Sequence, residues 1–189
     1  MRRQLLILAF MAAAPLARAD YQPTIGLYYV EHTLGTSFSG SGSKSVKSNP
    51  GVGILFGLDG GGGDRIGLDA SSFDLGNDDS LDLYTLNYDH FLSGLDGIPP
   101  ELRFFVGGSV GYGKLDINPS AGLGGAKDSN ISYGARLGAD YRFTPQLSLE
   151  LGVRYLYTDL KADLTGSGGT ARFSVKDDTS GWLGINYRF

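Results

Sequence analysis

The chain has 189 residues, of which 30 are glycine and none is cysteine, and its 16 basic and 20 acidic residues give a net charge of −4. Glycine has more than twice its usual share of about 7%, yet proline is scarce and 41% of residues are hydrophobic, which excludes collagen, a linker and a disordered chain. The mean hydropathy of −0.08 excludes a bundle of membrane helices, the missing cysteine excludes disulfides, and the acidic balance argues against nucleic acid as a partner.

The N-terminus has the pattern of a secretory signal peptide. Arg2 and Arg3 precede an apolar stretch over residues 5–14, and Ala17-Arg18-Ala19 supplies a small-x-small cleavage pattern. The stretch is too short for a transmembrane helix, which needs about 20 apolar residues. The sequence therefore predicts a signal peptide over residues 1–19 and a mature domain over residues 20–189.

After this segment, apolar and polar residues alternate with a period of two, which is typical of β-strands, and helical spacing is rare. The alternation predicts eight strands of about the length that a tilted strand needs to cross a membrane, 9–11 residues. In chain order they cover residues 24–32, 51–58, 65–75, 81–92, 102–115, 129–143, 147–160 and 179–189.

The third of these segments is irregular. Ile66 and Leu68 alternate in one phase, whereas Phe73 and Leu75 alternate in the other. A single inserted residue shifts the phase in this way, so the pattern predicts a β-bulge.

The connections differ in length on the two sides of the sheet. Long ones follow the first, fifth and seventh strands, and the ones after the second, fourth and sixth are shorter. Outer-membrane barrels have long extracellular loops and short periplasmic turns, so the pattern predicts that orientation. The long connections are 35–50, 116–128 and 161–178, of which 171–176 alternates and predicts a partial extension of the hairpin.

The two faces of the strands differ in chemistry. In the sixth segment, Tyr133, Leu137 and Tyr141 lie in one row, and Gly134 and Arg136 in the other. A soluble lipocalin-like barrel alternates as well, but with its apolar face inside. Eight strands carrying this many large apolar residues would overfill so narrow an interior. The pattern therefore favours a membrane barrel with apolar rows outside and glycine, serine and charged residues inside.

The chain ends inside a strand, with Leu183, Ile185, Tyr187 and Phe189 on one face. Together with residues 129–157, this end resembles the small outer-membrane barrels of the OmpA, OmpX and opacity-protein superfamily. The resemblance implies an all-β, eight-stranded antiparallel up-and-down transmembrane β-barrel in the bacterial outer membrane. It also implies that these four residues form the signal for barrel assembly.

Seven charged residues fall on the row predicted to face the lumen. Charge inside a narrow barrel must be paired, and we expect Glu150 to pair with Arg142 or Arg136. The favoured interpretation is a polar plug, and the alternative is a gated path for small ions. The residues are Arg103, Arg136, Asp140, Arg142, Glu150, Arg154 and Arg188.

The sequence offers weak signals for catalysis or metal binding. Asp89 and His90 are adjacent in a strand and point to opposite faces, so they and Ser93 do not form a catalytic set. The acidic pairs 78–79 and 177–178 could hold a divalent cation, but solvated loop tips explain them more simply. We predict no catalytic, cofactor or metal site.

Three classes of function remain. The leading one is a monomeric barrel with a structural or surface-interaction role through its extracellular loops. The second is a narrow conduit for ions or small hydrophobic solutes, like OmpW-type proteins, and the third is a lipid A-modifying enzyme. The expected partners are outer-membrane lipid and lipopolysaccharide, with the barrel assembly machinery and periplasmic chaperones during biogenesis.

Overall fold

The computed structural model describes residues 21–38, 41–47, 50–60, 63–76, 79–92, 95–117, 126–166 and 169–189, which form strands, turns and bends. The predicted signal peptide lies outside the described residues. In the part of the chain that is described, no helix is long and apolar enough to span a membrane. The strands are β1 (Tyr21–Phe38), β2 (Ser41–Lys47), β3 (Gly51–Gly60), β4 (Asp64–Gly76), β5 (Asp79–Leu92), β6 (Leu102–Ile117), β7 (Ala126–Arg142), β8 (Leu147–Gly166) and β9 (Gly169–Arg188).

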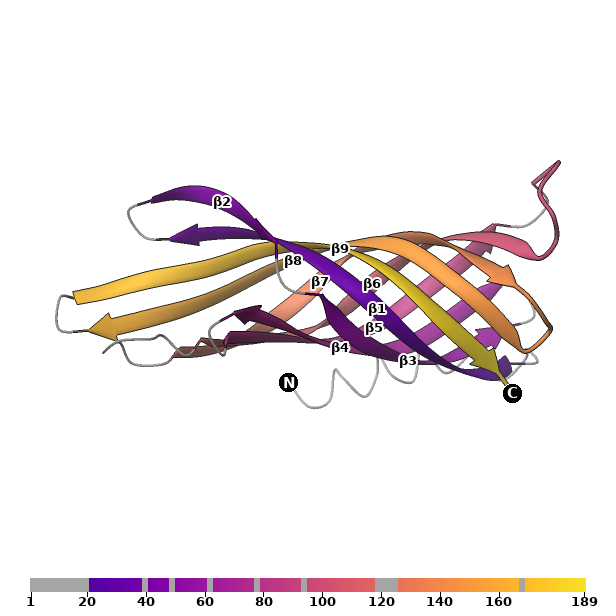
Figure 1. The fold of residues 1–189 in the computed structure, drawn as a ribbon, viewed down its shortest axis with the longest axis horizontal. Coiled ribbons are helices and arrows are strands. Elements are labelled where there is room, and N and C mark those ends of the chain that lie inside the picture. The colour runs from indigo at the N-terminus through magenta and orange to yellow at the C-terminus, as the bar shows by residue number, and fades with distance from the viewer. Residues whose placement is uncertain are drawn as a thin grey trace, which may run out of the picture.

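The strands close into an antiparallel barrel (Figure 1). From β3 to β9 each strand pairs with the next along the chain, and β1 pairs with β3 over residues 21–30. The barrel closes because β1 also pairs with β9, from Thr24 opposite Arg188 to Phe38 opposite Phe173. Eight strands, β1 and β3–β9, thus make the wall, which confirms the predicted up-and-down topology.

The two ends of the barrel differ. Tight connections such as 143–146 lie at the end with the C-terminus, which we call the turn end. At the opposite, hairpin end, β8 and β9 run on as a long ribbon to Gly166 opposite Gly169, and β1 continues as a hairpin with β2 (Figure 1).

Two of the predicted long loops are therefore mostly strand. Residues 161–166 and 169–178 belong to β8 and β9, and residues 35–38 and 41–47 to β1 and β2. The side chains of the β8–β9 ribbon explain why residues 161–178 are mostly strand. Leu160, Ala162, Leu164 and Val175 are buried on one face, and burying this apolar row outweighs the low strand propensity of the neighbouring glycines and aspartates.

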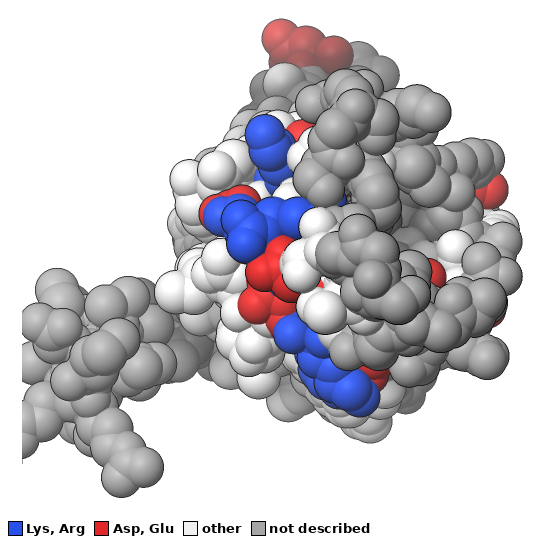
Figure 2. Space-filling model, turned by 90° about the vertical axis from the view of Figure 1, so that its left-hand side faces the viewer, with Lys and Arg blue, Asp and Glu red and all other residues white. Residues whose placement is uncertain are grey.

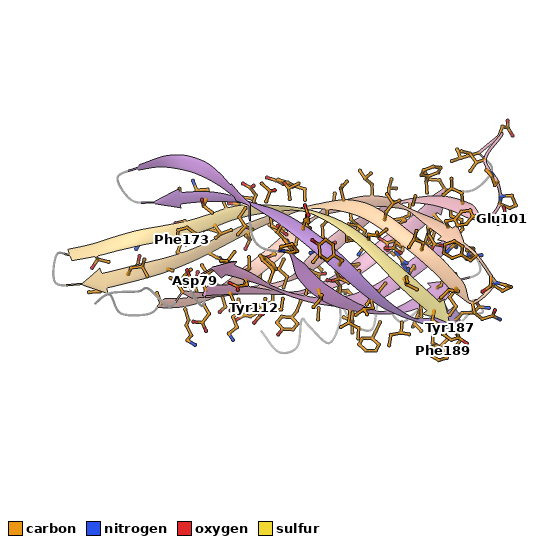
Figure 3. The ribbon with its side chains drawn as sticks, in the orientation of Figure 1. Asp79, Glu101, Tyr112, Phe173, Tyr187 and Phe189 are labelled. Carbon is orange, nitrogen blue, oxygen red and sulfur yellow. The ribbon has the colours of Figure 1, made fainter. Side chains whose placement is uncertain are left out.

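The outside of the wall is apolar, as the alternation predicted. Leu137 and Tyr155 expose 56% and 51% of their surface, and Tyr112 and Tyr187 project outward in Figure 3. The inward rows at the same level are mostly glycine, serine, threonine and charged residues, with a few buried apolar and aromatic side chains such as Leu55 and Phe105. This arrangement confirms the inside-out polarity that separates a membrane barrel from a soluble one.

The predicted bulge in the third strand is wrong as placed. β4 pairs with β5 without interruption from Asp64 to Asp74, and a register shift occurs only between Asp74 and Gly76. Ile66 and Leu68 face outward, whereas Phe73 faces inward and is only 3% exposed. The apolar residues of β4 switch sides along the strand. Its first half lies in the apolar band around the outside of the wall, which we call the apolar belt, whereas its second half lies beyond this belt and packs into a core inside the barrel.

That core occupies the hairpin end of the interior and was not expected, because the inward row was predicted to be polar throughout. Above the belt, the wall is no longer surrounded by apolar surface, so its hydrophobic side chains turn inward as in a soluble protein. The buried cluster consists of Leu34, Phe73, Leu81, Leu83, Leu115, Ile117, Leu156, Leu160, Ala162, Leu164 and Val175.

Candidate functional site

The interior towards the turn end is a polar lumen, and glycines determine its shape. A Cβ atom on Gly53 would collide with the ring of Tyr28, and one on Gly152 would collide with the ring of Trp182. At Gly138, a Cβ would lie 2.6 Å from the Phe105 ring. Inward glycines therefore leave the space into which large side chains of neighbouring strands fold. This explains much of the glycine excess in the strands.

The layer at the turn end joins arginines to two aspartates. Arg188 donates from Nε to Asp59 at 2.8 Å and from Nη2 to Asp140 at 2.9 Å. Arg103 donates to Asp140 at 2.6 Å and to Asp59 at 3.2 Å. Arg142 lies farther away, 3.7 Å from Asp59, and its side chain is about one-third exposed. Each aspartate is thus shared between guanidinium groups from different strands.

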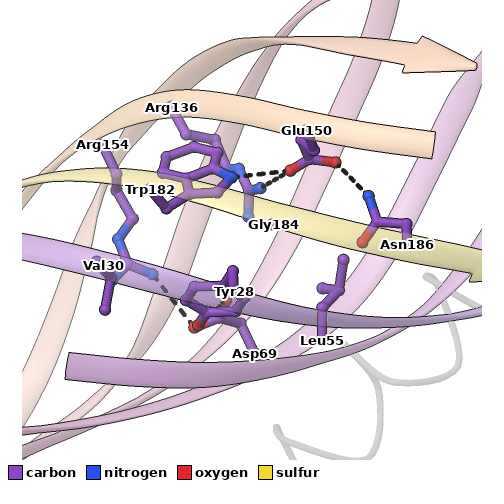
Figure 4. Close-up of a pocket in the computed structure, with 10 residues that line it drawn as sticks. All are labelled: Tyr28, Val30, Leu55, Asp69, Arg136, Glu150, Arg154, Trp182, Gly184 and Asn186. Carbon is purple, nitrogen blue, oxygen red and sulfur yellow. Dashed lines mark hydrogen bonds and ion pairs between the residues drawn. The ribbon is translucent and has the colours of Figure 1, made fainter.

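The next layer is centred on Glu150. Its carboxylate accepts from Arg65 at 2.5 Å and from Arg136 at 3.3 Å. Trp182 Nε1 donates to the same carboxylate at 3.0 Å and Asn186 at 2.9 Å, so both oxygens are engaged (Figure 4).

Asp89 closes this layer into a square of alternating charges. Arg65 donates to it from Nε and Nη2 at 3.0 and 2.8 Å, and Arg136 Nε lies 3.1 Å from its other oxygen. Two arginines therefore face two carboxylates, which balances the charge within the layer. Aromatic rings cover the cations, since Arg136 lies 4.6 Å above the ring of Trp182.

A third layer lies towards the hairpin end. Arg154 reaches Asp69 at 3.3 Å, and the Tyr28 hydroxyl donates to the other oxygen of Asp69 at 2.5 Å (Figure 4). Arg154 also donates to Ser180 at 3.3 Å. Between the second and third layers lies a cavity of about 10 Å³, bordered by Tyr28 and Trp182. Such a space holds about one water molecule.

Above these layers, His32 marks the change from polar to apolar interior. It is fully buried, bonds Asp178 through Nδ1 at 2.8 Å, and stacks on Phe73 with ring centres 3.7 Å apart. Asp178 is only 1% exposed, so its interpretation as a solvated loop tip is wrong. The residue lies inside because β9 extends to Gly169 and carries it within the wall.

The structure brings all seven predicted lumen residues to the interior, in the layers described above. Glu150 pairs with Arg136, one of the two expected partners, while Arg142 contacts Asp59 and Asp140 instead. Asp140 lies directly opposite Glu150 across β7 and β8, so neither arginine is its direct cross-strand neighbour, and Arg136 reaches the carboxylate from farther along β7.

Sequence reasoning missed four charged members of the network. Arg65 and Asp59 flank a glycine run that was assigned to a turn, and Asp69 and Asp89 lie in strands whose alternation was unclear. The overlooked signal lies in β4, where Arg65 and Asp69 alternate with Ile66 and Leu68, which face outward. Because alternate residues of a strand face opposite sides, this alternation would have placed Arg65 and Asp69 inside the barrel.

Comparison with known proteins defines what this barrel is. The family model of the outer membrane protein beta-barrel domain matches residues 5–189. The chain belongs to this family. It therefore resides in the bacterial outer membrane, with its short turns in the periplasm and its hairpin end outside the cell.

Solved structures of similar barrels support the fold of this outer-membrane barrel. Neisserial surface protein A is 17% identical, with a TM-score of 0.63 over 88% of this chain and 97% of that one. Ail of Yersinia pestis is 14% identical, with a TM-score of 0.56 over 90% and 99%, and the N-terminal barrel of Pseudomonas aeruginosa OprF is 15% identical, with 0.52 over 90% and 100%. No curated protein sequence matches the chain.

The extracellular end of the barrel carries mixed charge, with basic and acidic side chains next to one another in Figure 2. Lys127 pairs with Asp116 at 2.6 Å, and Lys161 with Asp159 at 2.5 Å. On the β8–β9 ribbon, Arg172 donates to Asp163 at 2.6 Å and lowers the pKa of that carboxyl group. Among the described side chains of this end, these basic groups are therefore neutralised by acidic neighbours.

The weak catalytic candidates do not come together. Asp89 is buried in the lumen, while His90 is exposed on the outside, where it bonds Asp64 at 2.8 Å. Ser93 lies outside the described residues, as does Asp78 of one acidic pair. Among the residues that the structure describes, no group of three His, Cys, Asp or Glu is placed to hold a metal ion.

Proposed function

We propose that this outer-membrane barrel is closed to solutes and has a structural or surface-interaction role through its extracellular hairpins. The observation that carries the proposal is the filled interior. Three charged layers and an apolar cluster follow one another along the axis, and the cavity between the charged layers admits about one water molecule. Opening a path would require breaking buried ion pairs, which is strongly unfavourable.

The hairpins supply the surface for interaction. The β8–β9 ribbon is held by backbone pairing to its tip and by an apolar face, so it presents its outward residues on a rigid element. A structure of Ail holds the heparin analogue sucrose octasulfate. The paired charges among the described side chains of this end favour a protein partner over such a polyanion.

Shortening the ribbon tests the surface role. Replacing residues 164–171 with Asn-Gly keeps the Asp163–Arg172 pair next to a two-residue turn that favours hairpins. We expect the variant to assemble normally but to lose the adhesion or protein binding that cells gain from the wild type. Equal binding by both strains would contradict the proposal.

Conductance measurements test the closed lumen against the conduit alternative. In planar bilayers at neutral pH, we expect the wild-type barrel to show no stable open level. A steady, ohmic conductance would support the conduit instead. We propose no enzymatic role, since Asp89 and His90 lie on opposite faces of β5.

A further inference from the structure

The outer surface of the barrel is not uniform, because a groove crosses it from β4 to β8. The space within the groove is about 830 Å³, in the size range of small-molecule sites. Its floor is formed by Gly108 and Ala135, which pair directly across β6 and β7. Tyr88 and Tyr155 flank this pair on the adjoining strands, and Tyr133 lies above it.

No contact inside the described part of the protein and no backbone conformation requires glycine at position 108. A Cβ added there would meet nothing nearer than the carbonyl oxygen of Gly134, at 3.8 Å. Its backbone is not among the described glycines with positive φ, which are Gly63, Gly76 and Gly97. Its neighbour Gly107 differs, since a Cβ there would strike Asp89 and the carbonyl oxygen of Tyr88. The gap at Gly108 therefore shapes the exterior and serves no packing need of the lumen.

We infer that this groove seats one acyl chain of an outer-membrane lipid. The groove opens on the apolar belt, which in the outer membrane faces hydrocarbon, and no charged residue lines it. The floor between the tyrosine side chains can accommodate a flexible hydrocarbon chain. The surface of a folded protein is too bulky to reach this floor.

A second copy of the barrel fits the groove poorly. In a two-fold dimer each patch meets its own equivalent, so a groove centred on the contact would face a groove and leave a void. Voids forfeit the dispersion contacts that drive association within a membrane. An acyl chain has no such restriction.

No charged residue lines the groove, so the headgroup is not selected within it. Above the groove, Lys127 and Lys161 pair with Asp116 and Asp159, whereas Lys114 on β6 is exposed and forms no ion pair with the residues that the structure describes. The site thus recognises the hydrocarbon chain, and this inference is independent of the proposed surface role.

Photolabelling tests the groove with tyrosines as internal controls. The mature barrel is reconstituted in phosphatidylcholine vesicles that contain a minor fraction of phosphatidylcholine with a diazirine in one acyl chain. Tyr133 and Tyr155 in the groove and Tyr29 and Tyr187 elsewhere have similar exposed fractions, 56%, 51%, 48% and 45%. We expect several-fold more labelling of the groove pair after irradiation, measured by peptide mass spectrometry.

Filling the groove should abolish this preference. Gly108→Leu and, independently, Ala135→Leu should reduce labelling of Tyr133 and Tyr155 to the level of Tyr29. The matched control is Gly181→Leu, since Gly181 is also outward, pairs with Val153 near the same level, and a Cβ there would meet only the Gly152 carbonyl oxygen at 3.8 Å. That variant should keep the wild-type labelling.

Two results would overturn the inference. Equal labelling of all four tyrosines in the wild type would mean that the groove holds only the ordinary lipid layer. Loss of the labelling of Tyr133 and Tyr155, but not of Tyr29 and Tyr187, as the protein-to-lipid ratio is raised would assign the groove to a second copy of the chain. Fast gel migration before boiling verifies that each variant is folded.

Discussion

Glu150 is the residue on which the lumen network depends most. It accepts hydrogen bonds from Arg65, Arg136, Trp182 and Asn186, and it is only 3% exposed. A carboxylate in such a position is stable because its partners repay the loss of water. Removing it leaves two buried guanidinium groups that share only Asp89.

Replacing Glu150 with alanine should therefore destabilise the barrel by about 3–5 kcal/mol. Urea unfolding of the variant in lipid vesicles measures the change in the free energy of unfolding. The matched control is Asp159→Ala, which removes an exposed pair with Lys161 and should cost about 0–1 kcal/mol. Equal stabilities of the Glu150 variant and the wild type would disprove the network as a source of stability.

At the scale of elements, the last strand carries the residues predicted to form the assembly signal. Leu183, Ile185 and Tyr187 face outward on β9, and Phe189, which follows the strand, is 71% exposed. Their exposure in the folded barrel makes them accessible before closure as well. We propose that they form the signal by which the assembly machinery recognises the chain.

A matched aromatic pair separates assembly from stability. Phe189 contacts Tyr187 with ring centres 5.1 Å apart at 80°, and Phe143 contacts Tyr141 at 5.1 Å and 79° (Figure 3 shows Tyr187 and Phe189). Phe189→Ala and Phe143→Ala should lower the unfolding free energy by similar amounts. Only Phe189→Ala should reduce the barrel recovered from the outer membrane of growing cells. Equal recovery of the two variants would refute the signal.

The elements differ in how well the sequence predicts them. The strands β7 and β8 could be predicted from alternation alone within the apolar belt, because one face contacts lipid and the other faces the lumen. The ribbon of β8 and β9 was assigned mostly to a loop because its glycines and aspartates have low strand propensity. The misplaced bulge in β4 has a related cause, since the sequence does not mark where the apolar belt ends.

At the scale of the whole molecule, closure of the barrel determines stability. Pairing of β1 with β9 removes both edges of the wall, so its backbone groups are satisfied within the sheet. The described lumen side chains then cross-link strands that are distant along the chain, such as Asp59 with Arg188.

The mature protein in detergent should therefore migrate faster on a gel before boiling than after it. The compact barrel resists detergent until heat breaks the sheet and the lumen network together. Glu150→Ala should lower the temperature at which the fast band converts to the slow one, while Asp159→Ala should not. Identical migration before and after boiling would be inconsistent with a closed barrel.

The sequence by itself determined the fold class, the number of wall strands, their polarity and the location in the outer membrane. These follow from a period of two residues and from which chemistry faces lipid, and both are local properties. Only the tertiary structure decided which charges meet, where the apolar core begins, and that a groove crosses the outside. Those features depend on barrel closure and on strand register. Closure brings Arg65 of β4 to Glu150 of β8 across the lumen, and register places Gly108 opposite Ala135, and neither leaves a trace in the local pattern.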